Sequence, residues 1–350
     1  MMIILALSTC ACSLTKVSRN SKKSGENTGF STVRDDGYLA ASFFAFDTYM
    51  TVIVYEDKDG QVDEKELQVL ADEAKRLEKI FSTTDKESEI YRFNQRSTDR
   101  VKLSEEALYL FDRTKEIYER TFGALDATAY PLVKAWGFTT GEHRIPSEDE
   151  LKKLLAHVGM EKIRAAGSEL IAEKGTELDF GAVAKGYLSN VLARMLKDMG
   201  AEHAMLDLGG NIEVIGTKED GSMWRIGIKD PTNDTGIIGS VSVSDKAVVT
   251  SGGYERYFTD DAGNVYWHIL DPSTGSPARS GVISATVVGD DATLCDALST
   301  AFFVMGVTGA ADYYDTYGGI EYILVMEDGS RIVSEGLEEV FTAADSSAVE

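Results

Sequence analysis

The sequence has 350 residues, of which 43% are hydrophobic and 27% are charged. This composition is typical of a globular protein with a substantial core, built as one large domain or two closely joined ones. The 58 acidic residues outnumber the 35 basic ones, which gives a formal net charge of −23. Such a charge repels nucleic acid, so nucleic acid is excluded as a partner. An anionic ligand could still bind where a metal ion or backbone N–H groups offset the local carboxylates.

The N-terminus has the pattern of a lipoprotein signal. The run MMIILALSTCACS begins apolar, is too short to span a bilayer and reaches small residues just before cysteine. We therefore expect residues 1–12 to be a signal peptide, with Cys12 as the lipidated residue and Cys10 as the alternative. No Lys or Arg precedes either cysteine, so a frayed hydrophobic terminus is the other interpretation. Cys295 is the remaining cysteine, and one thiol excludes a disulfide framework in the folded part.

The rest of the chain divides into a tether, one large domain and a tail. Residues 13–42 are polar, rich in Ser, Lys and Asn and without a hydrophobic period, so they are predicted to form a flexible tether. A single large domain is expected over residues 43–341. The acidic, Ala- and Ser-rich residues 342–350 are expected to be a disordered tail.

Within the domain, apolar spacing and turn residues predict strands and helices. In chain order, the predicted elements are a strand at 50–55, helices at 64–80, 104–121 and 148–158, a strand at 176–179 and a helix at 181–199. They continue with strands at 204–208, 212–215, 224–228, 239–243, 256–258, 266–270 and 284–288, a helix at 293–305 and a strand at 321–325. Many short strands joined by turns indicate an α+β fold with antiparallel sheets flanked by helices.

Asp296 and Thr300 form the first candidate site. They are four residues apart in a helical segment, so both side chains lie on one face of the helix. A carboxylate and a hydroxyl are hard oxygen ligands of the kind that Mg²⁺ prefers. On its own, such a pair in an apolar helix is more often a helix cap or a packed polar pair.

Two glycine-rich segments are candidates for ligand contact. Asp179, Gly181, Ala182, Lys185 and Gly186 lie where a strand is expected to turn into a helix. Small residues let the backbone approach a phosphate there, and the helix start offers N–H groups and a favourable dipole. Tight helix packing with an exposed lysine is the alternative. A second turn is either a ligand contact or a simple hairpin, and its residues are Asp207, Gly209, Gly210 and Asn211.

His268 is the candidate general base. It ends a predicted strand, just before a turn that contains Asp271, Pro272, Thr274 and Gly275. A histidine in such a place can accept a proton, with the nearby acid orienting it or holding a metal. A histidine that serves only the core or the turn is the alternative interpretation.

Six motifs together resemble a known family. In order along the chain they are GALDATAYPLVKAWGF, LDFGAVAKGY, LDLGGN, TSGGYERYF, HILDPSTGSPA and CDALSTAFFVMG. They are similar to the motifs of the FAD:protein FMN transferase family, the ApbE-type flavin transferases, over most of the chain from Phe43 to Val340. The resemblance implies an α+β, T-fold-like domain with helical additions, which binds FAD with Mg²⁺ at the pyrophosphate. It also implies a protein that is lipid-anchored on the extracytoplasmic face of the cell membrane.

The resemblance assigns roles to single residues. It implies that Asp296 and Thr300 bind the metal, together with the backbone carbonyl of Ala182, and that His268 is the base. The positions that match cofactor-contacting residues of the family are Phe46, Ala124, Leu125, Asp126, Lys185, Ile269 and Asp271. One departure concerns the flavin ring, since Phe46-Asp47-Thr48 stands where the family commonly has Met-Gly-Thr.

The implied function is a Mg²⁺-dependent transfer. The FMN moiety of FAD would pass to a Ser or Thr hydroxyl of a partner protein, such as a membrane redox subunit or an exported flavoprotein, and AMP would leave. Two alternatives use the same pocket. One is a FAD pyrophosphatase, in which water replaces the hydroxyl, and the other is a flavin-binding lipoprotein without enzymatic activity.

Overall fold

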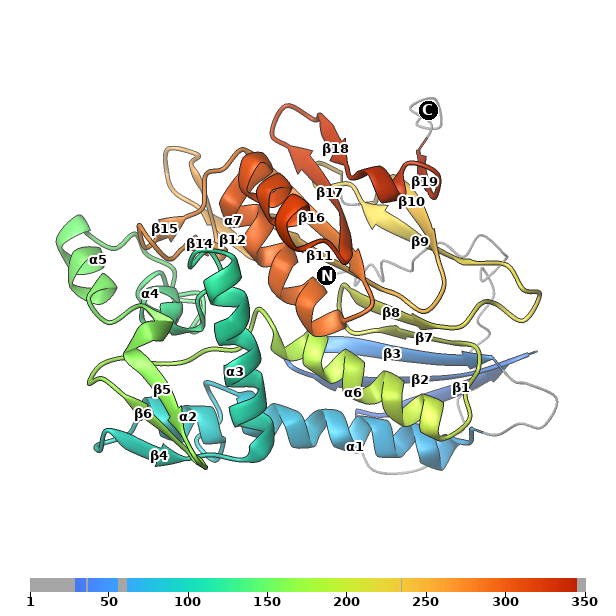
Figure 1. Cartoon of the computed structure of the whole chain (residues 1–350), viewed down its shortest axis with the longest axis horizontal. Coiled ribbons are helices and arrows are strands. Elements are labelled where there is room, and N and C mark those ends of the chain that lie inside the picture. Colours follow the sequence, from blue (N-terminus) through green and yellow to red (C-terminus); the bar gives the residue numbers. More distant parts are fainter. Residues whose placement is uncertain (1–28, 36, 56–61, 234, 345–350) are drawn as a thin grey trace.

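The structure is a computed structural model that describes residues 29–35, 37–55, 62–233 and 235–344. One large antiparallel sheet runs through the molecule, and long helices pack against it (Figure 1). The predicted signal peptide, with Cys10 and Cys12, lies outside the described residues. The α+β architecture with antiparallel sheets and flanking helices is confirmed.

The structure shortens the tether predicted at 13–42 and the tail predicted at 342–350. Strand β1 (Ser31–Asp35) pairs with β2 (Tyr38–Ala45), so the chain from residue 31 onward belongs to the sheet. Backbone hydrogen bonds to β2 order this stretch although its side chains are mostly exposed. At the other end, β19 (Phe341–Ala343) pairs with β10, so the first two residues of the predicted tail lie in a strand.

The main sheet has nine strands, and each neighbouring pair is antiparallel. In spatial order the strands are β1, β2, β3 (Thr48–Tyr55), β7 (Ala204–Asp207), β8 (Asn211–Ile215), β11 (Ala247–Gly252), β16 (Val282–Gly289), β17 (Ile320–Met326) and β18 (Arg331–Val333). Alternate residues of β2 are buried, as expected for a strand with one face on the core, whereas β16 is buried on both faces.

Seven α-helices pack around the sheets in the part of the chain that the structure describes. They are α1 (Glu64–Phe81), α2 (Glu89–Asn94), α3 (Glu105–Arg120), α4 (Tyr130–Ala135), α5 (Glu148–Leu155), α6 (Ala184–Asp198) and α7 (Ala292–Tyr317). Helix α1 opens with a capping box, in which Asp63 accepts hydrogen bonds from N–H groups of the first turn and Glu66 bonds back to Asp63. Its leucines at helical spacing face the core, because Leu67, Leu70 and Leu77 are fully buried.

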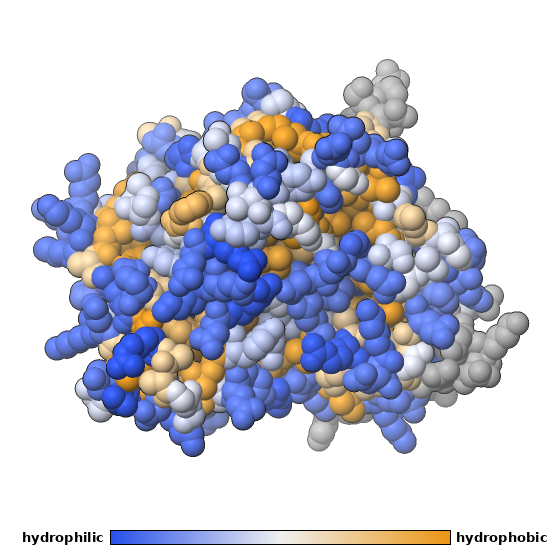
Figure 2. All heavy atoms as spheres, in the orientation of Figure 1, coloured by the Kyte–Doolittle hydropathy of each residue, from blue (hydrophilic) through white to orange (hydrophobic). Residues whose placement is uncertain are grey.

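The sheet is buried on both sides. On one side, α1, α6 and α7 pack on it and form the main hydrophobic core. On the other, a smaller core lies under the sheet of β9 (Trp224–Lys229), β10 (Ile237–Val243) and β19, where the rings of Tyr55 and Trp224 meet at 5.5 Å. Hydrophilic residues cover much of the outer face shown in Figure 2, in keeping with the high net charge.

Three small sheets complete the fold. They are β4 (Arg100–Lys102), β6 (Glu169–Ala172) and β5 (Ile163–Ala166); β12 (Tyr257–Thr259) with β13 (Val265–Trp267); and β14 (Leu270–Asp271) with β15 (Ser276–Pro277). The strand predicted at 266–270 is therefore interrupted at His268 and Ile269. The helix predicted at 181–199 begins three residues later, at Ala184.

The strand predicted at 176–179 is wrong. Leu178 is buried, but both its backbone groups are bonded to the side-chain amide of Asn94, at 2.7 and 2.8 Å. The next residue, Asp179, donates its N–H to the carbonyl of Ala127 at 2.8 Å. The backbone groups of Leu178 and the N–H of Asp179 are therefore satisfied without a neighbouring strand.

Helix α7 is longer than the predicted 293–305 and is broken at Gly306, whose φ is 71°. The Ser280 hydroxyl donates to the carbonyl of Phe303 at 2.6 Å, which satisfies a carbonyl near the break. By length and composition, α7 alone among the described helices could cross a membrane. It packs against β11 and β16, and its first half is almost entirely buried, so it is a core helix here.

Candidate active site

An open cavity of about 360 Å³ collects most of the residues that the motifs singled out. Its wall comes from the β2–β3 turn, the end of α1, residues 124–130, the start of α6, β11, the segment that follows β13, and α7. The predicted site residues that line it are Phe46, Ala124, Leu125, Asp126, Ala182, Lys185, His268, Ile269, Asp296 and Thr300. Segments from both ends of the domain therefore meet in one place.

Asp296 is the buried charge of this cavity. Its side chain accepts a hydrogen bond from the Gly186 N–H at 2.8 Å, and Lys185 Nζ lies 3.9 Å from its other oxygen. Burial raises the pKa of the Asp296 carboxyl, while the Lys185 ammonium and the Gly186 N–H act against that rise. Thr300 lies one helical turn further along α7, with Oγ1 3.2 Å from Ser251 Oγ. Both oxygen side chains of the predicted pair therefore reach the same cavity.

Gly186 explains how the carboxylate comes so close to α6. A Cβ at this position would lie 2.7 Å from Asp296 Cβ and 2.8 Å from the carbonyl carbon of Ala292. The N-cap residue of α6, Val183, makes no side-chain capping bond. Asp296 supplies the missing acceptor from a different helix, so the first turn of α6 and the carboxylate stabilise each other.

The side chains present fit Mg²⁺ that is shared with a ligand. Within the described ranges, no three or more His, Cys, Asp or Glu side chains gather as a closed metal site. Asp296 and Thr300 offer two oxygen ligands, and Ala182 lines the same cavity. Mg²⁺ usually keeps several waters and binds through one or two carboxylates plus substrate phosphates. The two side-chain oxygens beside an open cavity, where a phosphate can enter, fit this mode of Mg²⁺ binding.

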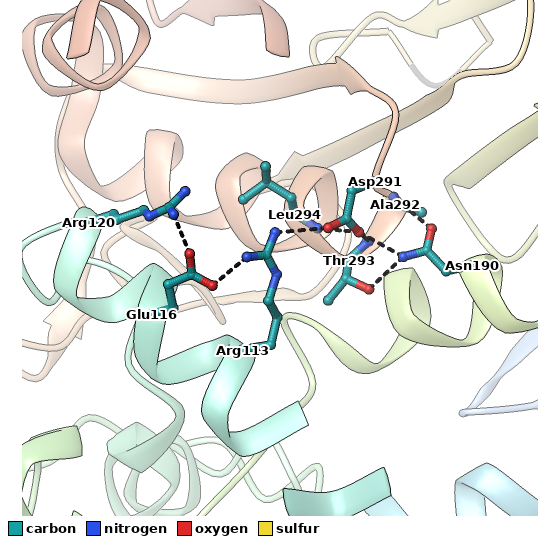
Figure 3. Close-up of polar contacts among 8 residues, drawn as sticks. All are labelled: Arg113, Glu116, Arg120, Asn190, Asp291, Ala292, Thr293 and Leu294. Atoms are coloured by element: carbon teal, nitrogen blue, oxygen red, sulfur yellow. Dashed lines mark hydrogen bonds and ion pairs between the residues drawn. The ribbon is translucent and has the colours of Figure 1, made fainter. Parts of the chain in front are cut away.

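The start of α7 is held by side chains from two other helices (Figure 3). Asp291 caps α7, because its Oδ1 accepts hydrogen bonds from the N–H groups of Thr293 and Leu294. Arg113 of α3 donates to Asp291 Oδ2 at 2.9 Å, and Asn190 of α6 donates to Oδ1 at 2.7 Å. The start of α7, just before its cavity-lining residues, is therefore fixed from α3 and α6.

His268 is oriented by the backbone of Arg256. The backbone N–H of His268 donates to the Arg256 carbonyl at 3.0 Å, and the ring Nδ1 of His268 lies 3.2 Å from the same oxygen. A carbonyl can only accept, so Nδ1 carries the proton and Nε2 keeps a free lone pair. Burial, with smaller contributions from the charges of Arg256 and Lys185, lowers the pKa of His268 to about 4. The ring is therefore neutral near pH 7 and able to accept a proton.

Aromatic side chains support the segment around His268. The ring of Phe138, which lines the cavity, lies edge-on to His268 with centroids 6.3 Å apart. Behind it, Phe258 stacks on His143 at 4.9 Å and on Tyr266 at 5.2 Å. These contacts hold the β12–β13 hairpin against the chain segment that forms this part of the wall.

Asp126 lies in another part of the cavity wall, next to Ala124 and Leu125. It caps the short 3₁₀ turn Ala127–Ala129 and accepts a hydrogen bond from the Thr128 N–H at 2.7 Å. Burial raises the pKa of Asp126 to about 6, against the hydrogen bonds from Thr128. A carboxyl with this pKa can lose or gain a proton close to physiological pH.

Two candidate aspartates, Asp271 and Asp207, do not line the cavity. Asp271, predicted to contact the cofactor, instead accepts hydrogen bonds from the N–H and hydroxyl of Ser273 at 2.8 and 2.6 Å and caps its own turn. Asp207 likewise accepts from the N–H groups of Gly209 and Gly210 at 3.2 and 3.3 Å. In both places an aspartate side chain closes a turn by accepting hydrogen bonds from nearby N–H groups, which is common for Asp residues in turns.

Three residues acquire roles that the motif analysis missed. Asn211 accepts a hydrogen bond from Lys185 Nζ at 3.0 Å, the Arg256 carbonyl orients His268, and Glu78 forms part of the cavity wall. Each contact joins segments that are distant in the sequence, so no local pattern reveals it. Asn211 was already a candidate for ligand contact and Arg256 lies inside the motif TSGGYERYF, whereas no motif contains Glu78.

The chain matches the model of the ApbE family over residues 46–324. It is 35% identical over 262 residues to the FAD:protein FMN transferase of Vibrio cholerae, covering 73% of this chain and 78% of that protein. It is 31% identical over 279 residues to the FAD:protein FMN transferase of Treponema pallidum, covering 74% and 76%.

Solved structures give the same result. The ApbE protein of Thermotoga maritima has a TM-score of 0.81 at 33% identity, covering 87% of this chain and 99% of that one. The flavin transferase ApbE of Vibrio cholerae has a TM-score of 0.78 at 29% identity, covering 89% and 99%. Fold, cavity and relatives together define an enzyme of the transferase class. The chain belongs to the ApbE family.

Proposed function

We propose that this enzyme transfers the FMN moiety of FAD to a Ser or Thr hydroxyl of a partner protein, in a Mg²⁺-dependent reaction that releases AMP. The observation that carries the proposal is that two kinds of group meet in one cavity. Asp296 and Thr300 offer hard oxygen ligands in one part of its wall, and His268, with Nε2 free, lies in another. Relatives named FAD:protein FMN transferase support the same reaction.

His268 moves the proton in this mechanism. Its Nε2 takes the proton of the acceptor hydroxyl as the hydroxyl oxygen attacks the FMN-side phosphorus. A new P–O bond to the acceptor forms, the P–O bond to the AMP phosphate breaks, and AMP leaves. The lowered pKa supports this role, because a base must be unprotonated when the substrate arrives. Lys185 lines the cavity as a cation that can stabilise phosphate oxygens.

Asp296, Thr300 and the Ala182 carbonyl would hold Mg²⁺ at the FAD pyrophosphate. When bound, the ion neutralises charge on the phosphate oxygens and on the departing AMP. Compensation of this kind is needed because several carboxylates line the cavity, namely Asp47, Glu78, Asp126, Asp179, Glu255 and Asp296. Without a cation they would repel a pyrophosphate.

The place of the reaction is part of the proposal. A lipid on Cys12, or on Cys10, would anchor the domain to the extracytoplasmic face of the cell membrane, where membrane redox subunits and exported flavoproteins are available as acceptors. The support is the sequence of residues 1–12 alone. Mass spectrometry of the N-terminal peptide from a membrane fraction tests it, and a mature N-terminus without lipid would refute it.

The reaction is tested with the full-length chain, FAD and MgCl₂, with and without a Thr-containing acceptor peptide and a Val-containing control. AMP release and the mass of the peptide are followed. A Thr peptide that gains one FMN, and loses this gain in EDTA, supports the transferase. AMP and free FMN without labelling indicate a FAD pyrophosphatase, and intact bound FAD indicates a flavin-binding protein without activity.

A further inference from the structure

The β2–β3 hairpin reaches the cavity through a turn with an unusual backbone. Ala45 pairs with Thr48, so Phe46 and Asp47 form a two-residue loop. Both loop residues have positive φ, 50° and 57°, as a type I′ turn requires. Such turns favour Asn-Gly, and left-handed backbone is unfavourable for a residue with a bulky side chain. Neighbouring contacts must therefore hold Phe46 and Asp47 in place.

Glu78 provides such a contact from α1. Its Oε1 accepts a hydrogen bond from the Phe46 N–H at 2.8 Å, and this bond is partly buried. Thr48, just past the turn, packs on Gly209, where an added Cβ would lie 2.7 Å from Thr48 Cγ2. The turn is therefore held between α1 and the loop that follows β7.

The turn and its carboxylate belong to the cavity itself. Phe46, Asp47 and Glu78 all line its wall. Burial raises the pKa of Glu78, Asp47 and Asp85 act in the same direction, and the Phe46 N–H and Lys75 oppose them. A carboxylate among such neighbours is unfavourable, which indicates that it has a specific use at this site.

We infer that Glu78 is a positioning residue for the flavin: its carboxylate holds the Phe46-Asp47 turn in the left-handed conformation that keeps Phe46 in the cavity wall beside the isoalloxazine of FAD. Glu78 acts through Phe46 and takes no part in the proton transfer. The inference rests on the proposed function for the identity of the ligand. It predicts a loss that concerns FAD and spares AMP, because the resemblance gives Phe46 as a contact of the flavin ring and AMP has no such ring.

The experiment compares Glu78→Ala, Glu78→Gln and Asp47→Gly in the full chain, with FAD and AMP as separate probes in binding titrations. Glu78→Ala should weaken FAD binding about tenfold, because the loss of a hydrogen bond to a charged group is of that order, and leave AMP binding within about twofold. Glu78→Gln keeps an acceptor oxygen and should bind FAD within about threefold of the native chain.

Rescue separates positioning from a general structural role. Glycine at the second loop position removes the strain of Asp47 and leaves that of Phe46, so Asp47→Gly added to Glu78→Ala should recover part of the lost FAD affinity. Asp72→Ala, which removes a carboxylate from the exposed face of the same helix, is the matched control. If Glu78→Ala alone fails to fold, the double variant is compared with Asp47→Gly and should bind FAD within about threefold.

Three outcomes would overturn the inference. They are an unchanged FAD affinity in Glu78→Ala, an equal loss of FAD and AMP affinity, and a double variant that binds FAD no better than Glu78→Ala. Failure of the proposed function looks different, because the native chain would then leave the acceptor peptide unlabelled in the transfer assay, whatever its FAD affinity. The titrations therefore test the role of Glu78, and the transfer assay tests the proposed function.

Discussion

Two walls of the cavity are built in opposite ways. The helix wall, formed by the first turn of α6 and by α7, holds Asp296 only 3% exposed against the backbone of Gly186. The hairpin wall, formed by residues 255–256, residues 268–270 and Pro272 at the base of the β12–β13 hairpin, holds a partly buried His268 beside an exposed Arg256. The charged oxygen site is locked into the core, and the proton acceptor lies near the surface.

The difference teaches what each wall must do in the proposed reaction. A site that holds charge gains from burial, because electrostatic interactions are stronger where water is excluded. A base that serves a hydroxyl on another protein must lie where that protein can reach it. Changes to the helix wall should therefore damage both charge and packing, whereas changes to the hairpin wall should damage only the chemistry.

Asp296→Asn is expected to have the largest effect. It removes the charge of the helix wall and keeps an oxygen that can accept the Gly186 N–H, so AMP release should fall about a thousandfold. Initial rates measured over a range of MgCl₂ concentrations check this. Asp312→Asn, which changes an exposed position on the same helix, is the control. If Asp296→Asn releases AMP as fast as the native chain, Asp296 takes no part in the reaction.

His268→Gln should come next, with a loss of transfer of about a hundredfold or more. FAD binding should stay within about twofold, because the change affects the proton acceptor of the hairpin wall and not the phosphate site. His203→Gln is a matched control, since its Nδ1 also lies against a backbone carbonyl, that of Thr217, outside the cavity wall. If His268→Gln lowers FAD binding and the transfer rate equally, His268 has a structural role and is not the base.

Gly186→Ala tests the packing of the helix wall. The new Cβ would lie 2.7 Å from Asp296 Cβ, so the free energy of unfolding should fall by about 2 kcal/mol in urea titrations. Alanine is the better helix former by about 1 kcal/mol, so a loss can come only from the clash. A more stable variant would show that the two helices can move apart, and the helix wall would not be rigid.

The pH profile should show the smallest effect. The base works unprotonated, and its pKa of about 4 means that activity is kept above that pH and lost as the pH falls through it. Asp126 in the cavity wall titrates in the same range, with a pKa of about 6, so the profile is measured in Asp126→Asn. In that variant the rate should change less than about twofold between about pH 5.5 and 7.5, whereas an ordinary histidine would lose about tenfold. Far-ultraviolet circular dichroism checks that the fold persists. A steep fall below pH 6.5 would mean that His268 keeps its ordinary pKa in the working enzyme.

Elements with strong local signals could be predicted from the sequence. The leucine spacing of α1, and the strand around β3, gave boundaries within two residues of those observed. The extended segment around Leu178 could not, because the side-chain amide of Asn94 takes the place of a partner strand. Residues 31–35 have mostly exposed side chains and are ordered by pairing with β2, and β2 itself buries Leu39 and Ala41 in the core only once the sheet has formed.

The candidate site divides in the same way. Asp296 and Thr300 were predictable because helical spacing alone puts them on one face. The proton position on His268 was not, since it depends on a carbonyl twelve residues away. Nor was the part played by Glu78, which meets Phe46 only after α1 has packed on the sheet.

The ammonium of Lys185, 3.9 Å from the Asp296 carboxylate, has one further consequence. A buried anion without a cation nearby would oppose folding until its ligand arrived. Here a cation of the chain itself already faces the carboxylate, with Asn211 holding it in place. We therefore expect the chain to fold without its ligand and to stay folded between one round of binding and the next.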